Sequence, residues 1–117
     1  MSQFRALTVH IKALISANAD LAKYLGQGYI FTTIPSRFPC IYLDGFQCLD
    51  DKQDSWRVNI NFVTEDMSID ALPVARNVLN TLQRSPVILT QGMVNQPETE
   101  PALNRFRIPT IVYMSRL

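Results

Sequence analysis

Few residues of this chain have the type and spacing that chemistry requires. His10 is the only histidine, and it lies in an amphipathic segment. No serine or cysteine stands in a recognisable nucleophile motif, so neither a catalytic triad nor a zinc site is expected. Gly26-Gln27-Gly28 lacks the third glycine of a dinucleotide-binding loop and follows a predicted helix instead of a strand. We therefore expect no catalytic residues, no metal site and no cofactor.

Carboxylates and thiols offer two further candidates for chemistry. Asp50, Asp51 and Asp54 could bind a hard cation, but a charged run between two strands is usually a solvated turn. Cys40 and Cys48 lie in the same apolar segment, and one extended strand would hold them roughly 25 Å apart at about 3.3 Å per residue. That separation excludes a disulfide. We expect both to be buried thiols that act as small hydrophobes.

Arginines on predicted strands are more informative. Arg57, Arg105 and Arg107 each alternate with apolar residues, so each is expected on the strand face opposite the core. Arginine on such a face is either solvated or part of a contact with another subunit, where arginine is enriched. Glu98 and Glu100 lie in a proline-flanked acidic segment and could meet arginines of a neighbouring subunit. These five residues form the candidate subunit interface.

Two segments with alternating residues must position the arginines. Segment 55–66 is the clearest structural signal, because large apolar residues alternate with polar ones at the period of a strand. The segment at about 103–114 has the same alternation. Pro109 cannot donate to a ladder, which predicts that this last strand lies at a sheet edge, or at least that the nitrogen of Pro109 points toward open space. The predicted inner face of the first segment carries Trp56, Val58, Ile60 and Phe62.

The segment that begins at Cys40 allows two interpretations. If Asp44-Gly45 forms a hairpin turn, two short strands pair with each other. If Gly45 instead marks a bulge, one strand runs from Cys40 to about Leu49. We favour the long strand, because the polar run 50–54 is a better turn and lets that strand pair along the whole of 56–63.

Helical periodicity recurs in three segments, 2–17, 19–25 and 71–82. The first has a clear apolar stripe, which must cover another element. The second should be capped by Asn18 and ended by Gly26 in the left-handed conformation. The three segments therefore supply the helices of the predicted fold.

The third predicted helix should have Asp70 as its N-cap, because Pro73 is tolerated only in a first turn. Beyond that helix, the pattern predicts a strand at 87–89, a turn at Gln91-Gly92 and a short return strand. Segment 95–101 is polar and twice interrupted by proline, so we expect an exposed loop that is mobile in the free subunit.

Length and composition limit the classes of protein to which this chain can belong. The 117 residues fit one domain, 1–117, and the formal net charge of +1 gives no footprint for nucleic acid or a membrane surface. The amino terminus has no signal-peptide pattern, and no apolar stretch approaches the ~20 residues that span a bilayer; a cytosolic protein is expected. The order of elements predicts an α+β fold: a mixed, mainly antiparallel sheet with N-terminal helices and one crossover helix packed on one face.

This arrangement resembles the tail-completion or tail-terminator proteins of long-tailed bacteriophages and prophages, the class that includes the lambda-type tail terminator. The resemblance covers nearly the whole chain, while Pro73 and Pro109 depart from the pattern. Its elements are the opening amphipathic helix, Asp20–Gly26 leading into Tyr29–Phe31, the proline-flanked loop into Phe38–Asp44, the alternating strand Trp56–Phe62, the helix Ala71–Leu82 and the closing strand Arg105–Tyr113.

The resemblance implies a non-enzymatic role in virion assembly. Subunits of that family close into a ring, commonly six-fold, that caps the tail tube, stops its polymerisation and offers a surface to the head connector. DNA passes through the ring without being read. The implied partners are further copies of the chain, the tail tube protein and a head connector or neck protein. The implied location is the host cytoplasm during assembly, and then the tail or neck of the virion.

Two other functions stay open at this point. A head-closure or other neck component could use the same small fold. A small α+β ligand-binding or regulatory domain is a different class, for which a deep apolar pocket with convergent polar groups is expected. Neighbouring genes would discriminate between them, because portal, major tail protein and tape-measure genes would favour the virion role.

Overall fold

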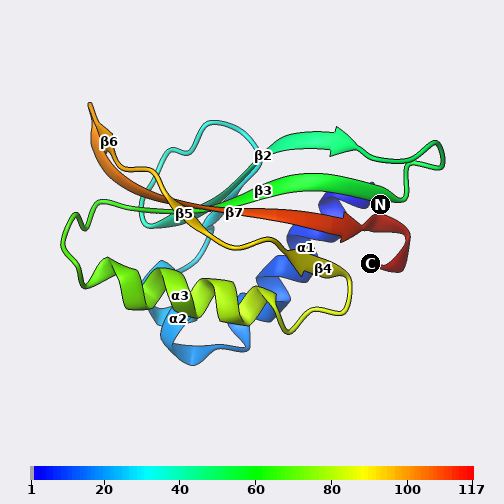
Figure 1. Ribbon diagram of the computed structural model, residues 1–117. Helices are drawn as coiled ribbons and strands as arrows, with labels where there is room; N and C mark the ends of the chain where they lie inside the picture. The colour runs from blue at the N-terminus through cyan, green and yellow to red at the C-terminus, as the bar shows by residue number, and fades with distance from the viewer. Residues whose placement is uncertain (1) are drawn as a thin grey trace.

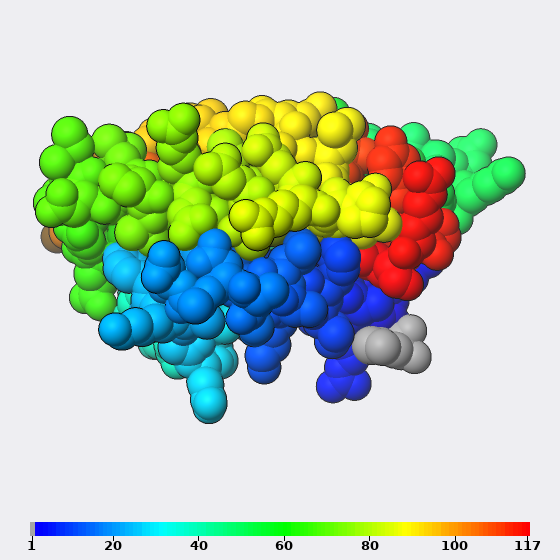
Figure 2. Space-filling model, turned by 90° about the horizontal axis from the view of Figure 1, so that it is seen from below, coloured from blue at the N-terminus to red at the C-terminus, as the bar shows by residue number. Residues whose placement is uncertain are grey.

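The computed structural model describes residues 2–117 and has a layer of helices on one face of a mixed sheet (Figure 1). Seen from the helical side, α1, α2 and α3 lie next to one another over that face (Figure 2). The α+β class predicted from the sequence is confirmed. In chain order the elements are α1 (Gln3–Ser16), α2 (Ala19–Leu25), β1 (Ile30–Phe31), β2 (Cys40–Cys48), β3 (Ser55–Thr64), α3 (Ala71–Leu82), β4 (Ile88–Thr90), β5 (Val94–Asn95), β6 (Glu98–Thr99), β7 (Ala102–Tyr113) and the short 3-10 helix η1 (Met114–Arg116).

Strand order in the sheet is β1-β2-β3-β7-β4, with β5 and β6 pairing further along β7. Within residues 2–117 the β1–β2 pair is parallel, and the other pairs are antiparallel. β3 and β4 therefore run in the same direction with β7 between them, and α3 is the crossover that joins them. No helix of residues 2–117 has the length and apolar character to cross a membrane.

The last strand, β7, lies inside the sheet, so the prediction that Pro109 places it at an edge is wrong. β7 pairs with β3 from Asn104 to Tyr113 and with β4 and β5 on its other side. The carbonyl of Pro109 accepts a hydrogen bond from Gln91 N at 2.8 Å. The nitrogen of Pro109 points to that same side of β7. The edge formed by β4 and β5 is interrupted there, so the missing N–H of the proline costs the sheet no hydrogen bond.

β4, β5 and β6 form one edge line along β7, which corrects two predictions. Between Thr90 and Val94 this line has one residue more than β7 has across from it, so Gln91-Gly92 belongs to a bulge and is not a chain-reversing turn. Segment 95–101 is largely exposed, as predicted, but it is not a loop throughout: β5 and β6 pair with β7, and Gln96 N donates to Arg105 O at 2.7 Å. Backbone pairing with β7 gives the strand residues of this segment their extended conformation.

β2 is a single long strand with a bulge, which confirms the favoured interpretation of Asp44-Gly45. Asp44 pairs with Asn59, and Gln47 pairs with Arg57, so β2 has one extra residue across this step. Gly45 has a φ of +67°, and a Cβ there would lie 2.4 Å from Nδ2 of Asn59. Glycine is therefore favoured at this position of the bulge.

Both α1 and α2 begin with a side-chain cap, and the cap of α2 is the one that the sequence predicted. Ser2 Oγ accepts from the backbone of the first turn of α1 at 3.1 Å. Asn18 Oδ1 accepts from Leu21 N at 3.3 Å, as predicted for α2. Gly26 ends α2 with a φ of 72°, but its ψ of −154° lies outside the left-handed helical region that we predicted.

α3 begins without the predicted cap. Asp70 has helical backbone angles, and its side chain makes no capping hydrogen bond. The chain turns into the helix around Ser68, whose Oγ accepts from Asp70 N at 3.2 Å and whose carbonyl accepts from Ala71 N at 3.2 Å. Pro73 lies in the first turn, as predicted.

The core lies between the helices and the inner face of the sheet. The rings of Phe62 and Phe106, both fully buried, stack with centroids 5.9 Å apart. Trp56, in contrast, lies at the rim, where it is partly exposed and packs edge-on against Phe4 at 5.1 Å. Other fully buried members are Leu7, Ile11, Ile15, Val58, Ile60, Val78, Leu82, Ile108 and Val112.

Candidate functional site

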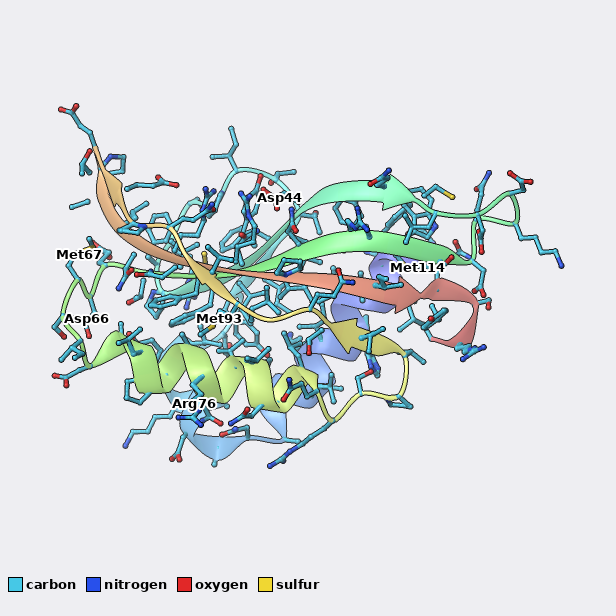
Figure 3. The ribbon with its side chains drawn as sticks, viewed as in Figure 1. Asp44, Asp66, Met67, Arg76, Met93 and Met114 are labelled. Carbon is cyan, nitrogen blue, oxygen red and sulfur yellow. The ribbon has the colours of Figure 1, made fainter. Side chains whose placement is uncertain are left out.

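The face of the sheet turned away from α1, α2 and α3 is the candidate site, and we call it the helix-free face. Among residues 2–117 no helix covers it (Figure 1). Figure 3 shows Asp44 on this side of the sheet and Arg76 on the opposite, helical side. Strand alternation places on it Tyr42 and Asp44 from β2, Arg57, Asn59, Asn61 and Val63 from β3, and Arg105, Arg107, Pro109 and Ile111 from β7.

The three predicted arginines all lie on the helix-free face, but the structure does not bring them all together. Arg105 and Arg107 are neighbours on β7. Arg57 pairs across the sheet with Ile111, which puts it about 13 Å along β7 from Arg107 at ~3.3 Å per residue. Arg57 is exposed, whereas the other two are partly buried.

Arg105 forms an ion pair within its own chain. Its Nη1 is 3.6 Å from Oε1 of Glu98, and its Nη2 donates to Oε1 of Gln96 at 3.4 Å. A solvent-accessible pair of this kind contributes only ~0–1 kcal/mol to stability. Glu98 therefore lies beside an arginine, but in the free chain that arginine is its own. Glu100 lies apart, in the exposed turn between β6 and β7.

Three polar atoms of this face are buried without a hydrogen-bond partner among the described residues: Nε of Arg105, Nε of Arg107 and Oδ1 of Asn61. Asn61 is fully buried, and its Nδ2 donates to the carbonyl of Tyr42 at 3.0 Å and to Oδ1 of Asp44 at 2.9 Å. A buried polar group left unpaired costs about 1–3 kcal/mol. Hydrogen bonding on this face is therefore incomplete in the single chain.

An apolar groove of about 370 Å³ lies at one end of the helix-free face. Its base belongs to a small second cluster of buried side chains, Cys40, Val63 and Leu103, against which Phe31 and Phe38 pack. The proline-flanked loop 32–39 closes one side, and Ile34 in that loop is 86% exposed. The groove is lined by Ile34, Pro35, Phe38, Tyr42, Val63, Glu98, Pro101, Leu103 and Arg105.

A solved structure shares this architecture. The chain superposes with a TM-score of 0.65 and 15% sequence identity on a chain of the "Virion of native gene transfer agent (GTA) particle", over 87% of this chain and 89% of that chain. The fold is one that a virion contains. No protein-family model and no curated protein matches the sequence. At this identity the likeness establishes the fold that the two chains share.

His10 lies against a serine, a contact that the sequence did not predict. Its Nε2 is 2.6 Å from Oγ of Ser85, at the end of α3. Burial lowers the pKa of His10, so the neutral ring is favoured near pH 7, and either partner can donate in this hydrogen bond. Ser85 Oγ also accepts from Val87 N at 3.2 Å, and within residues 2–117 no carboxylate bonds to the histidine. The pair lacks the third member of a triad and joins α1 to the end of α3.

The Gly26-Gln27-Gly28 turn binds an arginine of the same chain. The guanidinium of Arg37 donates to the carbonyl oxygens of Leu25 and Gln27. The turn therefore presents acceptors, whereas a phosphate-binding loop presents N–H donors. Arg37 also lies at the C-terminal end of α2, where a cation is favourable.

The carboxylates of the β2–β3 turn accept hydrogen bonds from the chain itself. Asp50 accepts from Asp54 N at 2.9 Å, and Asp54 accepts from Ser115 N at 2.9 Å. Hydrogen bonds from Ser115 hold the pKa of Asp54 below its usual value. Across residues 2–117 no three His, Cys, Asp or Glu side chains are grouped as metal ligands. These aspartates organise the turn and attach η1 to it.

The two cysteines are free and differ in exposure. Cys40 is buried, and burial raises the pKa of its thiol to about 11. Cys48 is exposed, which contradicts the prediction that both thiols are buried. Cys48 is the last residue of β2, in the part after the bulge whose residues are all exposed, and it pairs with Trp56 at the rim of the core.

Proposed function

We propose that this protein is a non-enzymatic structural component of a phage-like particle. The observation that carries the proposal is the fold likeness to a gene transfer agent virion chain, because it covers nearly the whole of both chains. A shared fold alone does not assign a role, so the proposal also depends on the surface. The helix-free face, with its unpaired buried polar atoms and its groove, supports a role in contact with other protein chains.

Within the particle, we propose the role of tail terminator. Copies of the chain close into a ring, six-fold in the family that it resembles, which caps the tail tube, stops its polymerisation and provides the head-joining surface. Its partners are then further copies of itself, the tail tube protein and a head connector protein. Assembly takes place in the bacterial cytoplasm, and the ring stays in the tail or neck of the virion.

The side chains with catalytic potential support the non-enzymatic part of the proposal. His10 is hydrogen-bonded to Ser85 between two helices. Asp50 and Asp54 accept backbone hydrogen bonds in a turn. Each of these groups therefore has a structural partner that accounts for its position.

Tube polymerisation is the experiment that tests the terminator role. The purified protein is added to tail tube protein while tubes grow, and electron microscopy measures tube length and the density at tube ends. A terminator shortens the tubes and leaves a ring at one end. A neck component leaves tube length unchanged and binds the isolated head connector instead. Binding to neither structure would contradict the virion role.

A further inference from the structure

Both outer sides of the sheet include backbone that no strand covers among residues 2–117. On one side, β4 and β5 pair only with β7. On the other side, β1 pairs with β2 only at Ile41 and Tyr42, so β2 is free from Leu43 to Cys48. Figure 2 shows the yellow and orange residues of the β4–β5 side forming a margin of the molecule beside α3. The sheet therefore has two uncovered edges on opposite sides.

Neither edge has the lysines or prolines that normally protect a free edge strand. From Val87 to Gln96 the chain contains no charged residue and no proline. From Leu43 to Leu49 the only charged residue is Asp44. Natural proteins place lysine, proline or other charges on free edges, because such edges pair with other chains. The composition of both edges is that of strands that acquire a partner.

The outward-facing backbone groups can be assigned from the hydrogen bonds. Gln91 N donates to Pro109 O, and alternate residues of an antiparallel strand point the same way. Leu89 therefore faces β7, whereas the N–H and C=O of Thr90 face outward. On β2, Leu49 N donates to Ser55 O, so the backbone groups of Cys48 face outward. Each edge thus offers unpaired donors and acceptors.

We propose that the β4–β5 edge of one copy pairs with the free part of β2 in the next copy, so that the sheet continues across the subunit boundary. Within the chain, β2 and β4 run in opposite directions. Placed edge to edge with the same orientation, two copies therefore form an antiparallel pair. The contact uses two different patches, and such a contact repeats until rotation closes it into a ring. This inference rests on the proposed ring-forming function and names its interface.

Apolar side chains beside the first edge support the pairing. Leu89 is 54% exposed and Val94 is 50% exposed, and both lie on the helix-free face because they pair with Ile111 and Arg107 of β7. An added strand would cover these side chains and would extend the helix-free face into the neighbouring copy. Association would then bury apolar area as well as pairing backbone groups.

Thr90→Pro is the first test, because proline removes an outward-facing N–H without breaking a bond to β7. Thr90→Val keeps that N–H and is the matched control. Sedimentation velocity over a concentration series should show assembly of the wild type and of Thr90→Val, and at least a tenfold weaker association of Thr90→Pro. Circular dichroism checks that both variants are folded.

The exposed native thiol provides a second test that does not depend on proline. A second cysteine is placed in turn at Leu89, Thr90, Gln91, Val94 or Asn95, and the proteins are oxidised and run on non-reducing gels. Buried Cys40 stays out of this reaction. At one or more positions, pairing with Cys48 of a neighbour should give a ladder of dimers, trimers and larger chains. Cys48→Ser should abolish the ladder.

The outcomes separate this inference from the proposed function. If rings form while Thr90→Pro assembles like the wild type and no Cys48 cross-link appears, the edge pairing is wrong and the ring-forming function stands. A cross-link that stops at the dimer and survives Cys48→Ser shows pairing of like edges and also overturns the inference. If the wild type stays monomeric at every concentration and forms no ring on tail tubes, both proposals fall.

Discussion

The two faces of the sheet are built from the same strands, but they differ in how fully their side chains are buried and hydrogen-bonded within the chain. On the face beneath the helices, Ile60, Phe62 and Phe106 are fully buried among other apolar side chains. On the helix-free face, Arg105 and Arg107 each have a buried Nε without a hydrogen-bond partner among the described residues. The face beneath the helices buries its apolar side chains within the chain. The helix-free face has hydrogen-bonding groups without partners, and an apolar groove without an occupant, among residues 2–117.

This difference separates stability from assembly. Substitutions on the covered face remove apolar contacts that hold the fold together, so their effects should appear in unfolding experiments. Substitutions on the helix-free face remove exposed or half-buried polar groups, so their effects should appear in association. Each prediction below compares a change on one side with a matched change elsewhere.

The largest expected effect is on the covered face. Phe62→Ala should lower the free energy of unfolding by about 3–5 kcal/mol, as truncation of a buried aromatic does, because Phe62 is fully buried and stacks on Phe106. Arg57→Ala, on the opposite face of the same strand, should change it by less than about 0.5 kcal/mol. Urea denaturation measures both, and similar shifts of the two midpoints would contradict the assignment of the faces.

The bulge in β2 should give the next largest effect. Gly45→Ala should destabilise the protein by about 1–3 kcal/mol, since alanine is strained at positive φ and its Cβ would lie 2.4 Å from Asn59 Nδ2. Gly92→Ala is the control, because Gly92 also has a positive φ but no atom within 4 Å of the added Cβ. Thermal unfolding should rank Gly45→Ala as clearly worse, and the reverse order would mean that the clash is relieved without cost.

A smaller effect should appear as the pH is lowered. Burial lowers the pKa of His10 from its ordinary value of 6.5, so below that pH the unfolded chain binds a proton that the folded chain does not. Stability should therefore be full above pH 6.5 and fall as the pH drops below it. Denaturant midpoints measured from pH 8 to pH 5 should show this slope in the wild type and not in His10→Gln. An equal slope in both proteins would assign the loss to other groups.

Local patterns of the sequence were sufficient for most of the covered face. The alternation around Phe62 and the helical spacing of α1 and α3 identify the elements, because burial of one face imposes a period on the residues that line it. The choice of a bulge at Gly45 over a hairpin turn also followed from local evidence. That choice rested on the polar run at residues 50–54, which is a better turn than Asp44-Gly45.

Long-range pairing accounts for what the sequence did not predict. Pro109 suggested an edge strand, but an interruption in a partner distant in the sequence makes proline acceptable inside the sheet. The polar segment 95–101 becomes two strands because β7 offers it backbone partners. The contact between His10 and Ser85 depends on how α1 crosses the end of α3, which no local pattern encodes.

The candidate interface was predicted in part. Strand alternation was enough to place Arg57, Arg105 and Arg107 on one face. The pairing of Glu98 with Arg105 inside one chain depends on the β6–β7 hairpin, and the groove depends on the loop 32–39 folding over the sheet. Both involve segments whose backbone is set by tertiary contacts and not by local periodicity.

The central claim is that the helix-free face and the two sheet edges that border it form the assembly surface, with Arg57 beside β2 and Arg107 beside β5. Charge reversal on each side of the sheet tests this claim most directly. Sedimentation velocity would compare the wild type with Arg57→Glu/Arg107→Glu on the helix-free face and with Arg76→Glu/Arg84→Glu, exposed positions in α3 and just after it. Our account predicts that the wild type and the Arg76/Arg84 variant form the same closed oligomer, while the Arg57/Arg107 variant is folded but stays monomeric. Equal assembly of all three proteins would contradict it.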